Sequence, residues 1–121
     1  MEIAMPTDAE FLTRVYQLFN ARDMENVLAA MHRDVTWANG MDGGYVHGQD
    51  GVRDYWTRQW AILDPHVEPV GFSTGEDGSI IVDVDQKVYD LAGNLLVDKR
   101  VGHIFRIEDG LIRRFDIATE D

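Results

Sequence analysis

The side chain with the clearest chemical potential is His103, which lies in a segment expected to form one wall of a core. Residues 101–117 read VGHIFRIEDGLIRRFDI, and this pattern predicts a β-hairpin whose inner face is apolar except for His103 and Arg113. An imidazole can donate or accept a proton near neutral pH when a partner fixes its tautomer. His103 is therefore the first catalytic candidate. The alternative is a core histidine that is hydrogen-bonded to a neighbouring group.

A second polar candidate is Asn39, at the end of a predicted strand over residues 35–39. Its amide can orient a ligand carbonyl or a water molecule, and capping of the following turn explains the residue equally well. Trp37, Trp56 and Trp60 either line an aromatic pocket or fill a core. The side chains that we expect to contact a ligand are Val15, Trp37, Trp56, Trp60, Phe105, Arg113 and Phe115.

The position of Asp116 depends on the length of the hairpin loop. A three-residue loop at residues 108–110 pairs His103 with Phe115 and puts Asp116 on the outer face of the sheet. A two-residue loop at residues 109–110 pairs His103 with Asp116 and creates an acid–histidine dyad. The pattern favours the three-residue loop but leaves open whether Asp116 faces the cavity, and the difference of one residue decides whether a catalytic pair exists.

No metal or cofactor is expected. The four histidines, at positions 32, 47, 66 and 103, lack close ligand spacing. Residues 83–90 begin like a calcium loop but lack its glycine and its final glutamate, so they are better interpreted as the charged face of a strand. The chain contains neither a glycine-rich phosphate-binding motif nor a serine nucleophile motif.

The bulk composition predicts one domain over residues 1–121 and excludes several classes of partner. The 22 acidic side chains outnumber the 11 basic ones, giving a net charge of −11 that repels nucleic acid. The chain has no cysteine, which fits a reducing, cytoplasmic location. No segment approaches the roughly 20 apolar residues of a membrane span, so no membrane is expected as a partner.

The first half of the chain predicts three helices. Thr7 and Glu10 form a capping box for a helix that runs to about Ala21. Asp23 caps a short second helix, whose apolar side consists of Met24, Val27, Leu28 and Met31. A glycine-rich connection over residues 41–51 leads to a third helix, capped by Asp50 and ended by Asp64-Pro65, because the residue before a proline avoids the helical region.

The rest of the chain predicts an antiparallel meander over residues 67–73, 80–90, 95–107 and 111–117. Its register sets Lys87 opposite Asp98 and Asp85 opposite Arg100, which are attractive cross-strand pairs. The charged side chains, together with Ile104 and Ile112, then lie on the outer face. The inner face is largely apolar and is available for the helices to cover.

This order of elements resembles the cone-shaped fold shared by nuclear transport factor 2, the ketosteroid isomerases and the SnoaL-like polyketide cyclases. The resemblance is carried by FNARD at 19–23, DVTWAN at 34–39, GQDGVRDYW at 48–56, HIFRI at 103–107 and DGLI at 109–112. It implies an α+β barrel in which three N-terminal helices pack on a curved, mainly antiparallel sheet. Because the superfamily includes enzymes, carriers and dimerisation domains, the fold alone names no activity.

The polar residues of the isomerases are only partly kept. Their general base, three residues after the threonine that matches Thr36, falls at Asn39, and an amide cannot accept the proton. Their oxyanion tyrosine falls at Val15, with Tyr16 about 100° further round the helix and aimed elsewhere. Their protonated aspartic acid falls at His103. Isomerisation of steroids by that mechanism is therefore not expected.

The comparison with limonene epoxide hydrolases is also partial. Trp37 and Asn39 are similar to their aromatic and asparagine pair on the first strand. Arg100 is present, but Gly102 stands where their second aspartate would be required.

Three functions remain open. The leading one is a SnoaL-like domain that binds a small, largely apolar or polycyclic molecule in its cone, with His103 and Asn39 as polar contacts and an acid–base step such as isomerisation, cyclisation or hydration. The second is a non-catalytic carrier, in which no other titratable group reaches His103. The third is a homodimerisation module that uses the outer sheet face, with Ile104 and Ile112 in the interface.

Overall fold

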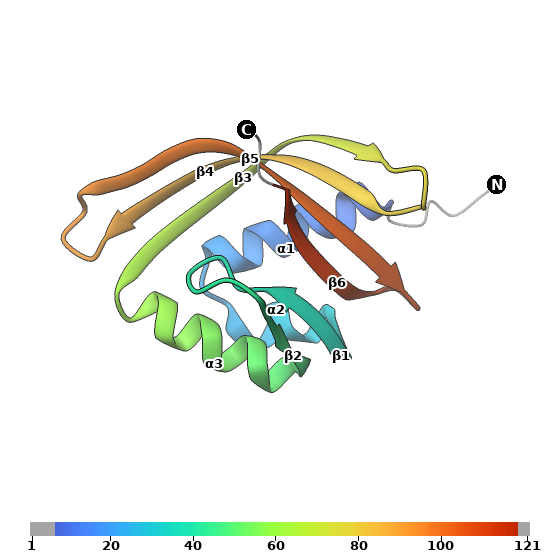
Figure 1. Cartoon of the computed structure of the whole chain (residues 1–121), viewed down its shortest axis with the longest axis horizontal. Coiled ribbons are helices and arrows are strands. Elements are labelled where there is room, and N and C mark those ends of the chain that lie inside the picture. The colour runs from blue at the N-terminus through green and yellow to red at the C-terminus, as the bar shows by residue number, and fades with distance from the viewer. Residues whose placement is uncertain (1–6, 119–121) are drawn as a thin grey trace.

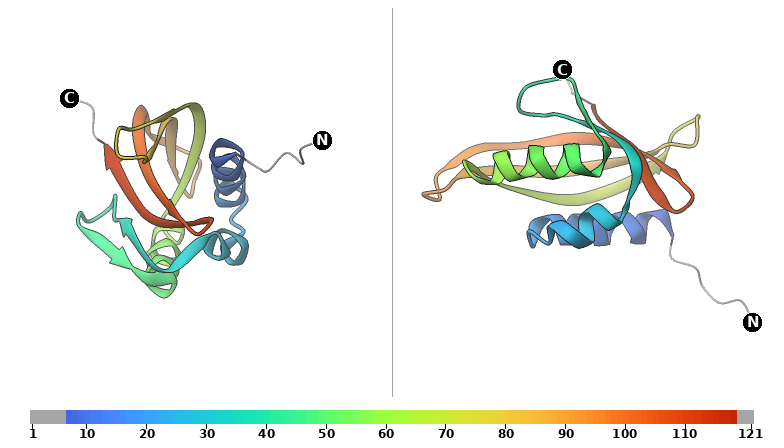
Figure 2. Two further views of the ribbon diagram at one scale, coloured as in Figure 1. Left: turned by 90° about the vertical axis from the view of Figure 1, so that its right-hand side faces the viewer. Right: turned by 90° about the horizontal axis from the view of Figure 1, so that it is seen from below.

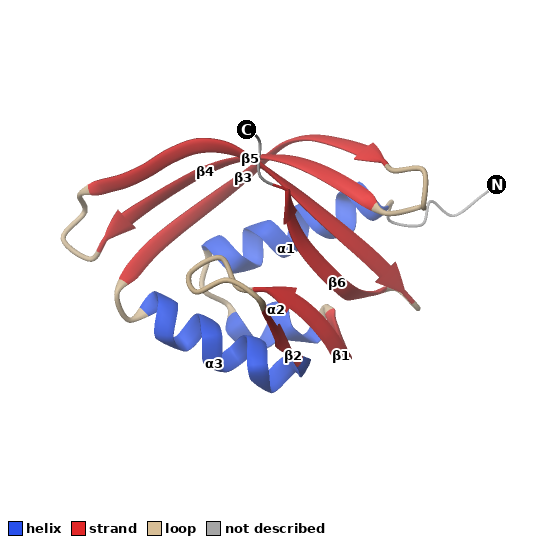
Figure 3. Cartoon of the chain, in the orientation of Figure 1, coloured by secondary structure: helices blue, strands red, loops and turns tan. Residues whose placement is uncertain are grey.

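The computed structural model describes residues 7–118, so residues 1–6 and 119–121 of the expected domain lie outside the described part. The elements are α1 (Asp8–Asn20), α2 (Met24–Ala29), β1 (Met31–Ala38), β2 (Tyr45–His47), α3 (Gly48–Trp60), β3 (Leu63–Thr74), β4 (Ile80–Asp90), β5 (Leu95–Glu108) and β6 (Leu111–Ala118). All three helices lie on one side of a curved sheet (Figures 1 and 3). None of the described helices is long and apolar enough to cross a membrane.

The sheet has six strands in the order β2-β1-β6-β5-β4-β3. β1 runs parallel to β6, and the other neighbouring strands are antiparallel. β2 and β3 are both edges, so the sheet curves around the helices without closing (Figure 2). This confirms the expected α+β class with three helices on a mainly antiparallel sheet, although the barrel is open.

The core lies between the helices and the inner face of the sheet. Its fully buried side chains come from both layers: Leu12, Val27, Met31, Val35, Val52, Val82, Val84, Phe105 and Ile112. The predicted capping box of Thr7 and Glu10 starts α1, and Asp23 caps α2 as expected. Met31, however, is the first residue of β1 rather than part of the second helix. It is buried as predicted, but from a strand.

The third helix is shorter at its C-terminal end than predicted. It begins at Gly48 rather than at Asp50 and ends at Trp60, and Asp64-Pro65 lies inside β3. A proline is tolerated there because β3 is an edge strand, where a missing N–H breaks no ladder on the open side. The predicted connection over residues 41–51 also contains β2, which pairs with residues 36–38 of β1.

The turn between β5 and β6 contains two residues, not the three that were expected. Asp109 and Gly110 have φ angles of 55° and 78°, and Glu108 pairs with Leu111 across them. Two successive positive φ angles are the mark of a tight hairpin turn whose twist matches that of the strands.

A β-bulge at Arg113 then restores the orientation that the three-residue loop would have given. The register shifts by one residue between Ile107, which pairs with Ile112, and Arg106, which pairs with Arg114. His103 consequently pairs with Ile117, and Asp116 faces outward opposite Ile104. Asp116 therefore lies on the outer face, as in the first of the two alternatives, but the cause is a two-residue turn combined with a bulge.

Two further side chains are placed differently from the prediction because of this bulge. Ile112, expected on the outer face, is fully buried beside Ile107 in the core. Arg113, expected on the inner face, sits at the bulge, where its guanidinium donates to the carbonyl oxygen of Asp34. By contrast, β4 and β5 have the predicted register, with Lys87 opposite Asp98 and Asp85 opposite Arg100.

Candidate functional site

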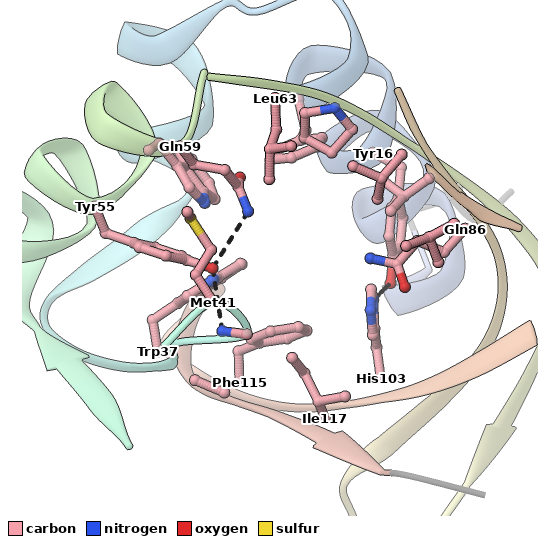
Figure 4. A pocket seen from close by; sticks show the side chains of 18 of the residues that line it. Tyr16, Trp37, Met41, Tyr55, Gln59, Leu63, Gln86, His103, Phe115 and Ile117 are labelled. Carbon is pink, nitrogen blue, oxygen red and sulfur yellow. Dashed lines mark hydrogen bonds between the residues drawn. The ribbon is translucent and has the colours of Figure 1, made fainter. Parts of the chain in front are cut away.

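A cavity of about 400 Å³ lies between the helices and the inner face of the sheet (Figure 4). Most of its lining is apolar or aromatic: Val15, Phe19, Trp37, Ala38, Gly40, Met41, Trp56, Leu63, Pro65, Val67, Val88, Val97, Phe105, Phe115 and Ile117. The polar lining residues are Tyr16, Tyr55, Gln59, Gln86, Lys99 and His103. Among the described lining residues there is no aspartate or glutamate, although the chain as a whole is strongly acidic.

The shortest hydrogen bond between polar groups of the cavity wall joins Tyr16 of α1 to His103 of β5. The hydroxyl oxygen of Tyr16 lies 2.7 Å from Nδ1 of His103, and both side chains are buried. Either the hydroxyl donates to Nδ1, which leaves the proton of the neutral ring on Nε2, or Nδ1–H donates to the hydroxyl oxygen, which leaves the O–H proton. In both arrangements one hydrogen of the pair is available for a ligand.

Burial keeps both members of this pair neutral at pH 7. It lowers the pKa of His103 to about 4 and raises the pKa of Tyr16 above its usual range. The pair therefore acts as a hydrogen-bond donor and not as an ion. A neutral donor held in an apolar site is suited to polarise a carbonyl oxygen and to stabilise negative charge that develops on it.

The placement of Tyr16 corrects the expectation drawn from the isomerases. Val15 also lines the cavity, but the tyrosine that holds the titratable group on β5 is Tyr16, which was expected to point elsewhere. A signal for this was present in the sequence. Leu12, Val15, Tyr16 and Phe19 follow the i, i+3, i+4, i+7 spacing of a buried helix face, so both residues turn toward the sheet.

The predicted aromatic lining is present except for Trp60. Trp37 stacks on Phe115 with ring centroids 4.2 Å apart and meets Trp56 edge-on. Trp60 is not among the lining residues. It stacks on Trp56, and Trp56 and Phe19 line the cavity in its place. Arg113 is also absent from the lining, as its position at the bulge requires.

Asn39, predicted as a polar contact for a ligand, lies outside the cavity lining. Its side-chain oxygen accepts hydrogen bonds from the backbone N–H groups of Met41 and Asp42, at 3.0 and 2.9 Å. The side chain thus caps the turn after β1, which is the alternative that the sequence left open. Asn39 affects the cavity indirectly, because Gly40 and Met41 of this turn line it.

Asp116 takes no part in the cavity. Its carboxylate accepts hydrogen bonds from the Tyr45 hydroxyl, at 2.6 Å, and from Arg114 on the outer side of the sheet. Partial burial raises the pKa of Asp116, but the hydrogen bonds from Arg114 and Tyr45 together lower it by more. The pKa of Asp116 therefore lies below its usual range. Among residues 7–118, no three histidine or acidic side chains come together as metal ligands.

A second polar group, which sequence reasoning missed, stands on the cavity wall formed by α3. The hydroxyl oxygen of Tyr55 accepts hydrogen bonds from the backbone N–H of Gly40, at 3.1 Å, and from the amide of Gln59, at 3.4 Å. The i, i+3, i+4, i+7 spacing of Val52, Tyr55, Trp56 and Gln59 is the signal in the sequence that points to this wall. Tyr55 and Gln59 face Tyr16 and His103 across the cavity (Figure 4).

The family follows from a match over most of the chain. A family model described as a SnoaL-like domain matches residues 12–115. The chain belongs to the SnoaL-like family. No curated protein sequence matches this SnoaL-like chain.

Solved structures with the same fold cover nearly the whole SnoaL-like chain. An NTF2-like protein of unknown function from Burkholderia pseudomallei is 27% identical, with a TM-score of 0.80, over 96% of this chain and 92% of that one. TerC, co-crystallised with polyporic acid, is 25% identical, with a TM-score of 0.79, over 93% and 90%. A putative polyketide cyclase from Pseudomonas putida is 20% identical, with a TM-score of 0.81, over 97% and 93%.

Proposed function

We propose that this SnoaL-like protein binds a small, largely apolar molecule of polycyclic size in its cavity, and that Tyr16 and His103 hold an oxygen atom of that molecule. The observation that carries the proposal is the 2.7 Å contact between the Tyr16 hydroxyl and Nδ1 of His103 on the wall of an otherwise aromatic and aliphatic cavity. A buried polar pair in such surroundings gives the site a defined point of recognition.

The size and lining of the cavity support binding of a ring system. A volume of about 400 Å³ falls within the roughly 300–1,000 Å³ of pockets that enclose drug-sized ligands. The co-crystal of TerC with polyporic acid is a further argument, because TerC shares the fold over nearly its whole length. The absence of carboxylates among the described lining residues favours a neutral or acidic ligand over a cationic one.

The chemistry that we propose is acid–base catalysis of the isomerase, cyclase or hydratase type. A hydrogen bond from the Tyr16–His103 pair to a carbonyl oxygen would withdraw electron density and acidify the adjacent carbon. The proton that leaves that carbon would pass to a water molecule, because the described lining residues include no carboxylate base, and the pair would stabilise the enolate that remains. Because both groups stay neutral at pH 7, the pair needs no prior ionisation to do this.

The reaction can be tested with 2-tetralone, a bicyclic apolar ketone, by following exchange of its α-hydrogens with D₂O by NMR. Wild-type protein is expected to accelerate the exchange, and His103→Gln to lose at least about tenfold of that acceleration, since a positioned donor contributes roughly 10²–10⁴-fold. Tyr16→Phe removes the hydroxyl of the other member of the pair. Tyr45→Phe, which removes a hydroxyl on the outer side of the sheet, is its matched control. Exchange at the same rate in wild type and His103→Gln would eliminate the catalytic role.

The second candidate is a non-catalytic carrier. It is favoured by the same lack of carboxylates in the described lining, and by the low pKa of His103, which makes its ring a weak base. Tyr16, a titratable group within hydrogen-bond reach of His103, counts against it. Binding of 2-tetralone without accelerated exchange would establish the carrier.

We also propose that two copies associate through the outer face of the sheet. Ile104, half-buried in the single chain, and the charged rows of β4 and β5 would form the contact. Ile112 cannot contribute, because it is buried in the core. Sedimentation equilibrium should give a dimer for wild type and a monomer for Ile104→Arg, whereas a monomeric wild type would refute this association.

A further inference from the structure

The hydroxyl of Tyr55 is a buried donor whose own hydrogen has no acceptor among the described residues. Its oxygen accepts from the Gly40 N–H and from the Gln59 amide, so the lone pairs are occupied while the O–H bond remains. Tyr55 is 4% exposed and lines the cavity. An oxygen atom of a ligand in the cavity is therefore able to accept a hydrogen bond from this hydroxyl.

The surroundings of Tyr55 keep that hydrogen in place. Burial raises the pKa of the Tyr55 hydroxyl, and the backbone N–H groups of Gly40 and Met41 lower it by less. The side-chain amide of Gln59 also lines the cavity, and its carbonyl oxygen is a hydrogen-bond acceptor. The wall at α3 therefore presents one O–H donor and one amide acceptor, which is the pattern that a hydroxyl or carbonyl group matches.

The two polar groups stand on opposite walls, with aromatic surface between them. Figure 4 shows Tyr55 and Gln59 on one side of the open space and Tyr16 and His103 on the other. Trp37 and Phe115, stacked with centroids 4.2 Å apart, line the space between. Flat aromatic walls favour a rigid ring system, and such a body holds its end groups at a fixed separation.

We infer that the cavity recognises its ligand at two ends: a rigid, fused-ring molecule with an oxygen function at each end, one bound by Tyr16 and His103 and the other by Tyr55 and Gln59. This rests on the proposed ligand-binding function and adds the substrate class. Tyr55 is thus a specificity-determining residue in addition to holding the turn at Gly40.

The test uses 17β-estradiol, a rigid four-ring probe with a hydroxyl at each end, and its 3-deoxy and 17-deoxy analogues, with affinities measured by isothermal titration calorimetry. In wild type, estradiol should bind roughly 3- to 10-fold more tightly than either analogue, because each removed hydroxyl deletes one neutral hydrogen bond. In Tyr55→Phe the advantage over one analogue should disappear, while the advantage over the other persists. In Tyr16→Phe the advantage that Tyr55→Phe removes should persist, and the advantage that Tyr55→Phe keeps should disappear.

Gln59→Leu is the second variant, because Tyr55→Phe also removes the acceptor of the Gly40 N–H and is able to disturb the turn. It should reduce the same hydroxyl advantage as Tyr55→Phe while leaving that N–H bonded. Tyr45→Phe, whose hydroxyl contacts Asp116 outside the cavity lining, should leave all three affinities unchanged, and circular dichroism will check that each variant is folded.

The outcomes distinguish a failure of two-ended recognition from a failure of the proposed binding function. If only one hydroxyl matters in wild type, or if both still matter in Tyr55→Phe and Gln59→Leu, two-ended recognition is wrong and single-point binding at Tyr16 and His103 stands. If none of the three probes binds, the proposed function itself is overturned, and this inference with it.

Discussion

His103 is neutral in the folded protein because it is buried, and this links its ionisation to stability. Burial lowers the pKa of its ring from 6.5 to about 4. Between these values the unfolded chain binds a proton that the folded chain does not, so stability falls as the pH drops through this window. The loss of stability is absent above pH 6.5 and grows as the pH falls to about 4.

We therefore predict that wild type loses about 3 kcal/mol more unfolding free energy than His103→Gln between pH 7 and pH 4, at 1.36 kcal/mol for each pKa unit. Urea unfolding of both proteins at the two pH values measures the difference, and all other titrating groups cancel in the comparison. Parallel pH profiles for the two proteins would show that the His103 ring titrates normally in the folded state.

Asn39 offers a second test at the residue scale, since its side chain caps the turn that lines the cavity. Asn39→Ala should cost about 1–2 kcal/mol of unfolding free energy, because two backbone N–H groups lose their acceptor. Asn39→Asp keeps an acceptor oxygen and should cost less. If Asn39→Ala instead abolishes ligand binding without a loss of stability, the residue contacts the ligand directly.

At the scale of elements, the sequence predicted the helices and the meander well and their junctions poorly. The alternation in β4 and β5 and the capping residues of α1 and α2 are local signals, and the structure follows them. The alternation breaks at the bulge, where two apolar residues, Leu111 and Ile112, precede two arginines, but this break alone does not say which strand carries an extra residue. The end of α3 was misplaced because Pro65 marks an edge strand here, and not the end of a helix.

The bulge is the element that decides which face of β6 lines the cavity. Deleting Arg113 should remove the bulge and leave Phe115 opposite Phe105, because Arg113 is the one extra residue between the pairs Ile107–Ile112 and Arg106–Arg114. Inserting one alanine between Arg114 and Phe115 should instead turn Phe115 outward and Asp116 inward, since a shift of one residue exchanges the faces of a strand. We expect the insertion to cost more than about 3 kcal/mol, as for removal of a large core side chain. Urea unfolding should show a much smaller loss for the deletion, and equal losses would contradict this role.

At the scale of the whole molecule, the sequence predicted the fold class and the inward position of His103 but not the full composition of the site. Tyr16 was assigned to the wrong side of its helix, and Tyr55 was not considered. Helical spacing places both side chains on the buried faces of α1 and α3. Which groups they meet across the cavity depends on how these helices pack against the sheet, and a single sequence does not give that packing.

The cavity itself can be tested by filling it. Val97 lines the cavity, whereas Val70 is an exposed residue of β3, so Val97→Trp and Val70→Trp form a matched pair. Val97→Trp should weaken binding of 17β-estradiol by at least tenfold through lost volume, and Val70→Trp should not change it. Isothermal titration calorimetry measures both, and equal affinities in the two variants would place the ligand outside this cavity.

The most direct test of the central claim is a long-range ¹H–¹⁵N correlation spectrum of the histidine rings at pH 7, with and without 17β-estradiol. The free protein should show a neutral His103 ring with one protonated and one bare nitrogen. Binding should shift the His103 nitrogens and leave those of His32, His47 and His66 in place. A charged His103 ring, or His103 signals that do not move when estradiol binds, would contradict the account.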